Sequence, residues 1–183
     1  MKLHRLTAIN FMPYKGQMVI DFPTDDYRNV MIVFGDNMRG KTSLLNAIRW
    51  GFYGKALGRH SRPIALAEMV NKEAALTDDW NIQVFIEFEA NGHQYDLRRS
   101  ASRRAHVAIP SRNEDFLPTL HLTRDGVAIA GDQVRYVSKG RLMRIADFRP
   151  PCAVHIVVVV LRTYTALVVR RTIDTIGGSI VPK

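Results

Sequence analysis

Residues 35–43 read Gly-Asp-Asn-Met-Arg-Gly-Lys-Thr-Ser and fit the pattern G-x-x-x-x-G-K-[ST] at every fixed position. This pattern is typical of a phosphate-binding loop, in which a curled backbone points N–H groups at an anion and leads into the positive end of a helix. Gly35 and Gly40 permit the curl. The spacing predicts that Lys41 reaches the β- and γ-phosphates of a nucleotide and that the Thr42 hydroxyl coordinates Mg²⁺. Ser43 and the Asn37 side chain would be further phosphate ligands.

The segments on either side of this loop have the patterns that it requires. Residues 30–34, Val-Met-Ile-Val-Phe, predict a strand buried on both faces in a parallel sheet. Apolar residues at helical spacing predict a helix from Lys41 to Tyr53, and Gly54 would end it. Strand, loop and helix follow in the required order, which favours a phosphate loop over a glycine turn with a chance lysine.

Alternating apolar residues predict β-hairpins in the rest of the first 130 residues. The first joins strands at 2–11 and 17–22 through a turn at 12–16, and the second joins strands around Ile82 and Tyr95 through Asn91-Gly92, the favoured pair for a type I′ turn. A third is expected around Arg124-Asp125-Gly126. Between the loop helix and the second hairpin, 58–63 reads as a loop and 66–74 as a short helix; further on, Asp132 could cap another helix.

Composition excludes several classes of protein. A chain of 183 residues with 46% hydrophobic and 23% charged residues is typical of one globular domain with its own core. The single cysteine, Cys152, allows no internal disulfide and no secretory leader opens the sequence, so we expect a cytoplasmic protein. The longest apolar run, 156–161, is too short to span a bilayer, so no membrane partner is expected.

The final quarter differs from the rest. Residues 139–183 contain eight of the 26 basic residues but two of the 17 acidic ones, within a net charge of +9. The strand predicted at 156–161 resembles the apolar half of a Walker B strand, yet Arg162 stands where an acid would hold Mg²⁺ and orient water. Two interpretations stay open: a replaced or out-of-frame C-terminus, or a poorly patterned strand and tail.

Other candidate residues favour structural roles. The basic stretch 98–112 could contact a nucleic-acid backbone, but without aromatic residues to stack on bases a solvated loop is the stronger interpretation. Trp50, Phe52 and Tyr53 are expected in the core. The six histidines lack metal-ligand spacing, so no zinc site is predicted.

Residues 1–137 resemble the N-terminal lobe of the SMC-like ABC ATPases, a RecF/SMC-type AAA group that includes the SbcC-type repair ATPases and the DndD-like proteins of DNA sulfur modification. The resemblance rests on the opening strand 1–11, on the loop and helix 35–48, and on the following hairpin. The phrase Arg-Trp-Gly-Phe-Tyr-Gly at 49–54 looks closest to the DndD-like branch. Met38 departs from the wider family, which usually has glycine there.

The resemblance implies an α/β P-loop NTPase fold: an incomplete ABC-type head lobe with a mixed sheet and an antiparallel β subdomain over 1–137, followed by the atypical basic, Val-rich tail 138–183. It implies that 5–14 lies near adenine and ribose. The positions expected to bind ATP and Mg²⁺ are Gly35, Asn37, Arg39, Gly40, Lys41, Thr42 and Ser43, with Thr42 as the metal ligand.

The family carries its signature motif, Walker B acid and histidine switch in a second lobe, and none of these motifs is recognisable in this sequence. We therefore expect no catalytic residue here, weak ATP–Mg²⁺ binding with negligible hydrolysis, and a need for a second lobe or homodimer, with DNA as the partner of the whole assembly. A stand-alone P-loop nucleotide kinase and a non-enzymatic DNA-binding fragment are the alternative interpretations.

Overall fold

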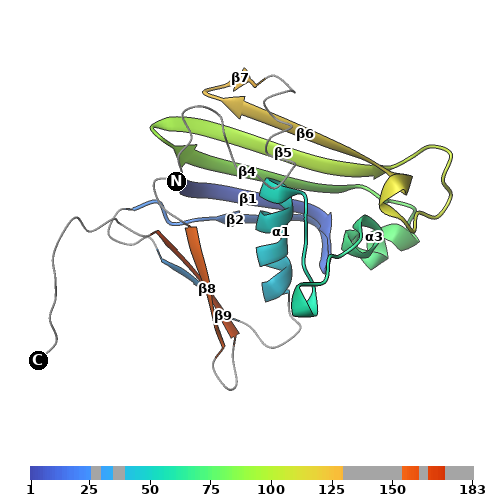
Figure 1. Cartoon of the computed structure of the whole chain (residues 1–183), viewed down its shortest axis with the longest axis horizontal. Helices are drawn as coiled ribbons and strands as arrows, with labels where there is room; N and C mark the ends of the chain where they lie inside the picture. The colour runs from blue at the N-terminus through green and yellow to red at the C-terminus, as the bar shows by residue number, and fades with distance from the viewer. Residues whose placement is uncertain (26–29, 35–39, 130–153, 161–164, 172–183) are drawn as a thin grey trace, which may run out of the picture.

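The computed structural model describes residues 1–25, 30–34 and 40–129, together with the backbone of two strands at 154–160 and 165–171. Strands β1, β2 and β4 to β7 form one sheet in the order β2-β1-β4-β5-β6-β7, and β3, β9 and β8 form another; every pairing is antiparallel. Helix α1 lies across one face of the large sheet (Figure 1). The bounds are β1 Lys2–Phe11, β2 Tyr14–Asp21, β3 Met31–Val33, α1 Lys41–Tyr53, α2 Leu66–Met69, α3 Lys72–Leu76, β4 Ile82–Ala90, β5 His93–Arg103, β6 Phe116–Arg124, β7 Val127–Ala128, β8 Val154–Val160 and β9 Thr165–Arg171, with 3₁₀ turns at Arg59–Ser61 and Asn113–Asp115.

The core lies between α1 and the inner face of the large sheet. Leu6 pairs in register with Ile86, Ile86 with Leu97, and Leu97 with Leu122, so one buried side chain from each of β1, β4, β5 and β6 lies in a row across the sheet. Period-2 alternation places these apolar residues on one face and polar residues on the other. The sequence pattern predicted this alternation, and the structure confirms it.

Helix α1 has the bounds that its sequence predicts. Its C-terminus is closed by Gly54 in the left-handed conformation (φ 68°), whose N–H donates to the Trp50 carbonyl. Gly51 lets the helix approach β4 closely, because a Cβ atom there would lie 2.5 Å from Cδ1 of Ile86. The Trp50 ring packs 5.7 Å from the ring of Phe11 on β1. The helix that follows the phosphate loop is therefore fixed on the sheet.

All three predicted hairpins form. Asn91 (φ 52°) and Gly92 (φ 76°) both have positive φ, as a type I′ turn requires, and β6 and β7 join through Asp125 and Gly126. In the first hairpin, β2 begins at Tyr14 instead of residue 17, and the turn is only Met12-Pro13. The positive φ of Met12 (53°) reverses the chain in these two residues.

The strand before the loop is not buried on both faces in a parallel sheet, as its sequence predicted. β3 pairs antiparallel with β9, and Ile32 and Phe34 expose 49% and 69% of their surface. A parallel neighbour must come from a crossover connection that returns to the same sheet. After α1, the described chain instead enters the antiparallel strands of the large sheet, so the parallel part of the expected mixed sheet is not present in the described residues.

Three smaller expectations need correction. Residues 98–103 continue β5 and are not a loop, because the alternation of buried residues runs on through Arg99 and Ala101; only the residues from 104 to 112 are irregular. Tyr53 is 38% exposed, whereas Trp50 and Phe52 are buried as expected. The helix predicted at 66–74 is two short helices, α2 and α3. The expectations on Asp132, Cys152 and Arg162 lie outside the described residues.

Candidate functional site

The end of the phosphate-loop motif forms the start of α1. Gly40 is buried, has φ 95° and ψ −3°, and its carbonyl accepts the first helical hydrogen bond, from the Leu44 N–H at 2.9 Å. Lys41, Thr42 and Ser43 make up the first helical turn, and Thr42 is exposed. Amides of a first turn have no acceptor within their own helix and lie at the positive end of its dipole. The Lys41 ammonium and the hydroxyls of Thr42 and Ser43 belong to the same turn as these amides. Together these groups suit the binding of a polyphosphate and its Mg²⁺.

The turn between β1 and β2 lies against this helix start. The Tyr14 hydroxyl donates a 2.9 Å hydrogen bond to the Gly40 carbonyl. A Cβ atom at Gly40 would lie 3.0 Å from Tyr14 Oη and 3.2 Å from Pro13 Cγ, so only glycine fits without displacing the turn. Burial raises the pKa of the Tyr14 hydroxyl, which therefore remains a donor at neutral pH.

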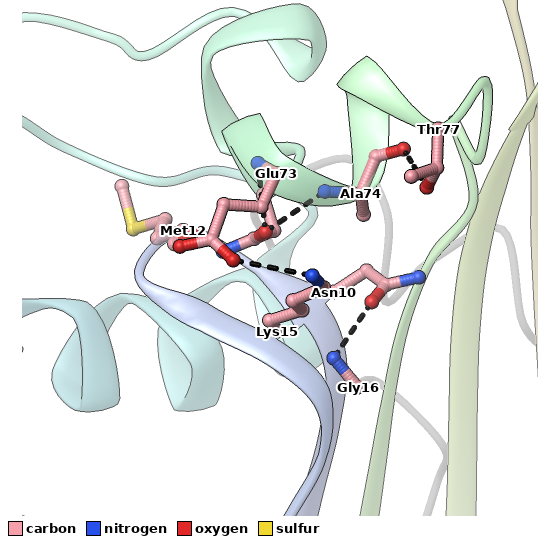
Figure 2. Close-up of polar contacts among 8 residues, drawn as sticks. Asn10, Met12, Lys15, Gly16, Glu73, Ala74 and Thr77 are labelled. Carbon is pink, nitrogen blue, oxygen red and sulfur yellow. Dashed lines mark hydrogen bonds and ion pairs between the residues drawn. The ribbon is translucent and has the colours of Figure 1, made fainter.

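Two asparagines, Asn10 and Asn71, hold that turn in place, and Figure 2 shows Asn10 beside Gly16. The Asn10 side chain accepts from the Gly16 N–H at 2.8 Å and donates to Asp79 Oδ2 at 2.7 Å. Asn71 donates through Nδ2 to the Met12 carbonyl at 2.8 Å. Its Oδ1 accepts from the N–H groups of Glu73 and Ala74 in the first turn of α3. One side chain thus caps α3 and fixes the β1–β2 turn, as expected for an N-cap asparagine with a spare amide donor.

Polar side chains also fasten the body and the far end of α1. Asn46, 1% exposed, donates to the Leu57 carbonyl and accepts from the Leu57 N–H. Arg99, on the inner face of β5, donates through Nε to the Gly51 carbonyl at 2.9 Å. Burial lowers the pKa of the Arg99 guanidinium to about 10. The last carbonyls of a helix lack intrahelical donors, so Arg99 satisfies one of them.

The structure brings together only part of the predicted site. Gly40, Lys41, Thr42 and Ser43 lie at the start of α1, whereas Gly35, Asn37 and Arg39 lie outside the described residues. From the segment 5–14, which the resemblance places near adenine and ribose, Tyr14 contacts Gly40. Arg5 instead pairs with Asp21 at 2.6 Å on the face of the sheet that α1 does not cover.

Some residues that shape the site are marked in the sequence as polar residues at core positions. Asn10, Asn46 and Arg99 each occupy a position that periodicity assigns to the core. A polar residue at a core position is usually hydrogen-bonded there, so it indicates a specific partner. The identity of each partner depends on contacts between distant parts of the chain.

Away from this site, the described residues also form a hollow on the large sheet. It measures about 460 Å³ and lies on the outer face of β4, β5 and β6, with Phe85, Glu87, Asp96, Arg98 and His121 among its lining residues. Within the described ranges, no three His, Cys, Asp or Glu side chains gather closely enough to hold a metal ion. The described helices include none of the length and hydropathy that crossing a bilayer would require.

Comparison with known proteins agrees with a nucleotide-binding class. A glycine-lysine-threonine motif opening a helix that packs on a sheet defines a P-loop domain. Residues 5–138 match the family described as AAA domain, and the chain belongs to that family.

Two similar proteins come from microorganisms. Over 105 residues the chain is 31% identical to the DNA double-strand break repair Rad50 ATPase of Thermoplasma acidophilum, covering 57% of this chain and 10% of that protein. The SMC head domain from Thermotoga maritima is 16% identical with a TM-score of 0.35, covering 74% of this chain and 41% of that one. The chain thus spans about a tenth of the length of the curated relative.

These findings confirm the coarse part of the sequence interpretation. The fold is an α/β lobe of the AAA P-loop family in which antiparallel strands dominate, and the similarity to a Rad50 ATPase supports the resemblance to that group of ATPases. The placement nearest the DndD-like branch stays a prediction.

Proposed function

We propose that this chain is an ATP–Mg²⁺-binding lobe of an SMC-like ATPase that acts in DNA repair or maintenance. The observation that carries the proposal is the junction at Gly40: the motif of residues 35–43 runs directly into α1, with Gly40 in the left-handed conformation and Lys41, Thr42 and Ser43 in the first helical turn. Membership of the AAA domain family supports it.

In this proposal each side chain has a distinct role. Lys41 neutralises the β- and γ-phosphates, and Ser43, Asn37 and Arg39 add phosphate contacts. Gly35 and Gly40 allow the backbone curl. Thr42, whose side chain is exposed at the helix start, would hold Mg²⁺, which neutralises charge between the phosphates when bound.

The lobe would not hydrolyse ATP by itself. A phosphate loop positions phosphates but does not activate water. We propose that the water-activating acid comes from a second lobe or a second copy, and that DNA binds the whole assembly. The named activity of the Rad50 relative supports the link to double-strand break repair. The phrase at 49–54 supports the narrower proposal of a DndD-like protein of DNA sulfur modification.

We further propose a boundary near residue 137, with 1–137 as the ATPase lobe and 138–183 as a distinct tail. The basic, Val-rich composition of 138–183 supports this division. The tail would still contribute to the frame of the loop, because β9 pairs with β3, the strand that precedes the loop.

Binding of ATP to the full chain tests the proposal. Titration with labelled ATP and Mg²⁺ should give saturable binding, and Lys41→Ala should weaken it at least tenfold because the compensating charge on the phosphates is lost. Lys55→Ala is the matched control, since Lys55 is an exposed lysine just beyond the other end of α1 and should leave binding unchanged. Phosphate release should stay at background.

Two results would contradict the proposal. Folded protein that shows no saturable ATP uptake would remove the nucleotide-binding function. Turnover that survives purification and disappears in Lys41→Ala would show that the chain supplies its own catalytic acid.

A further inference from the structure

The carbonyl oxygen of Gly40 accepts two hydrogen bonds from different parts of the chain. One comes from the Leu44 N–H at 2.9 Å, within α1, and the other from the Tyr14 hydroxyl at 2.9 Å, across from the β1–β2 turn. A carbonyl oxygen has two lone pairs, so both bonds can form together. The Tyr14 hydroxyl is thereby directed at the backbone of the loop.

The bond to this oxygen also sets the direction of the next amide. The peptide bond between Gly40 and Lys41 is trans and planar, so the Gly40 carbonyl and the Lys41 N–H point in opposite directions in one plane. Because the Gly40 oxygen is held toward Tyr14, the Lys41 N–H points away from Tyr14. Glycine adopts many combinations of φ and ψ at similar cost, so at Gly40 (φ 95°, ψ −3°) a hydrogen bond from outside the helix can select one orientation of this plane.

Tyr14 is itself held firmly enough to act as that constraint. Asn71 binds the Met12 carbonyl at 2.8 Å and Asn10 binds the Gly16 N–H at 2.8 Å, so the backbone is fastened on both sides of Tyr14. The site at Gly40 has no room for a side chain, since a Cβ atom there would lie 3.0 Å from Tyr14 Oη. The turn and the loop are thus packed in direct contact.

We propose that Tyr14 is a positioning residue of the phosphate loop: its hydroxyl orients the Gly40–Lys41 peptide so that the Lys41 amide faces the bound phosphates. This inference rests on the proposed ATP-binding function and names a residue outside the glycine-lysine motif. Tyr14 touches no phosphate in this role, because its hydroxyl is used on the carbonyl.

The test compares Tyr14→Phe with Tyr53→Phe in the full chain. Both changes remove one hydroxyl, but Tyr53 lies at the C-terminal end of the same helix and is partly exposed. The dissociation constants of ATP–Mg²⁺ and of inorganic tripolyphosphate are measured for each variant. In nucleotide-free protein, the ¹³C shift of the Gly40 carbonyl and the ¹⁵N shift of the Lys41 amide report the orientation of the peptide.

Tyr14→Phe should weaken ATP and tripolyphosphate binding by similar factors, roughly three- to tenfold, as expected for the loss of one hydrogen bond. It should also move both chemical shifts, whereas Tyr53→Phe should change neither affinity nor shift. A purely structural tyrosine would lower the melting temperature but leave the affinity of the folded protein unchanged, and that result would overturn the inference.

Two further outcomes separate this inference from the proposed function. Loss of ATP affinity with normal tripolyphosphate affinity would assign the hydroxyl to the nucleoside and would overturn a role in the phosphate cradle. If the wild-type chain bound neither ligand, the proposed function would fail, and unchanged Gly40 and Lys41 shifts in Tyr14→Phe would independently reject the control of the peptide by Tyr14.

Discussion

Arg99 shows how one buried charge can serve a helix. The residue is 6% exposed, and its Nε donates a hydrogen bond to the Gly51 carbonyl near the end of α1. Burial holds its pKa near 10, so the folded protein disfavours the charged form compared with the unfolded chain. The desolvation cost is present at neutral pH and would be relieved only as the pH rises above about 10. The hydrogen bond from Nε to the Gly51 carbonyl offsets part of that cost, while Nη2 is buried without a hydrogen-bond partner among the described residues.

Arg99→Ala should destabilise the fold by about 2 to 3 kcal/mol, because it leaves a cavity and deprives the Gly51 carbonyl of its donor. Denaturant unfolding measures this change. The control is Arg98→Ala on the opposite face of β5, where the guanidinium lies 4.7 Å from the centre of the Phe85 ring and should contribute less than about 1 kcal/mol. Equal losses in the two variants would reject the structural role of Arg99.

The sequence predicts the burial of Arg99 less clearly than the burial of its neighbours on β5. Tyr95, Leu97 and Ala101 share its face of β5, so alternation alone places position 99 in the core. The run of arginines at 98–104 instead favours a solvated loop, and the two signals conflict at this position. The hydrogen-bond acceptor of Arg99 is the Gly51 carbonyl of α1. The sequence of β5 does not predict this partner, because α1 lies far away in the sequence.

At the scale of elements, the contact between α1 and β4 depends on the absence of a side chain. A Cβ atom at Gly51 would lie 2.5 Å from Ile86 Cδ1 and 3.1 Å from Val84 Cγ1. Both isoleucine and valine belong to the buried core, so neither can move freely. Glycine costs about 1 kcal/mol relative to alanine inside a helix, and here it permits the close approach.

Gly51→Ala should therefore destabilise the protein by about 1 to 2 kcal/mol in spite of the better helix propensity of alanine. Ile86→Val removes the Cδ1 atom that the new methyl group would meet. The double variant should be more stable than the sum of the single effects predicts, by at least about 0.5 kcal/mol in a double-mutant cycle. Additive effects would show that the helix shifts as a whole and does not clash with Ile86.

Elements were predicted to different degrees. The bounds of β1 and α1 follow from periods of two and 3.6 residues and from Gly54, all of which are local. The pairing of β3 was predicted wrongly, because a run of five apolar residues does not identify its partner strand. The contact of Tyr14 with Gly40 joins two turns that only the assembled sheet brings together, so no local pattern could predict it.

At the scale of the whole molecule, three carboxylates lie at the connections outside the core. Each has a pKa below its ordinary value near 4: Asp78 through its hydrogen bonds to Arg103, Asp115 through the N–H groups of Arg112 and Ser111, and Asp125 through the Gln94 N–H and His93. Since the folded pKa is lower than the unfolded one, the stabilisation is present above about pH 4 and is lost as the pH falls through the folded values.

The melting temperature should therefore change little from pH 7 to 5 and fall below pH 4. Replacing the three residues together (Asp78→Asn, Asp115→Asn and Asp125→Asn) should lower the melting temperature at pH 7 and reduce the further fall at acid pH, because fewer groups take up protons on unfolding. Scanning calorimetry between pH 2.5 and 7 measures both effects. If the melting temperature of the triple variant fell below pH 4 as steeply as that of the wild type, other carboxylates would control the loss of stability in acid.

The pairing of Met31 with Val169 has a consequence for biosynthesis. A ribosome makes β3 well before β9, so the strand that enters the glycine loop lacks this hydrogen-bonding neighbour until β9 has emerged. Closing so long a loop of chain is entropically costly and slow. The segment proposed to hold the nucleotide should consequently acquire its native frame later than the large sheet, whose strands all precede β9 in the chain.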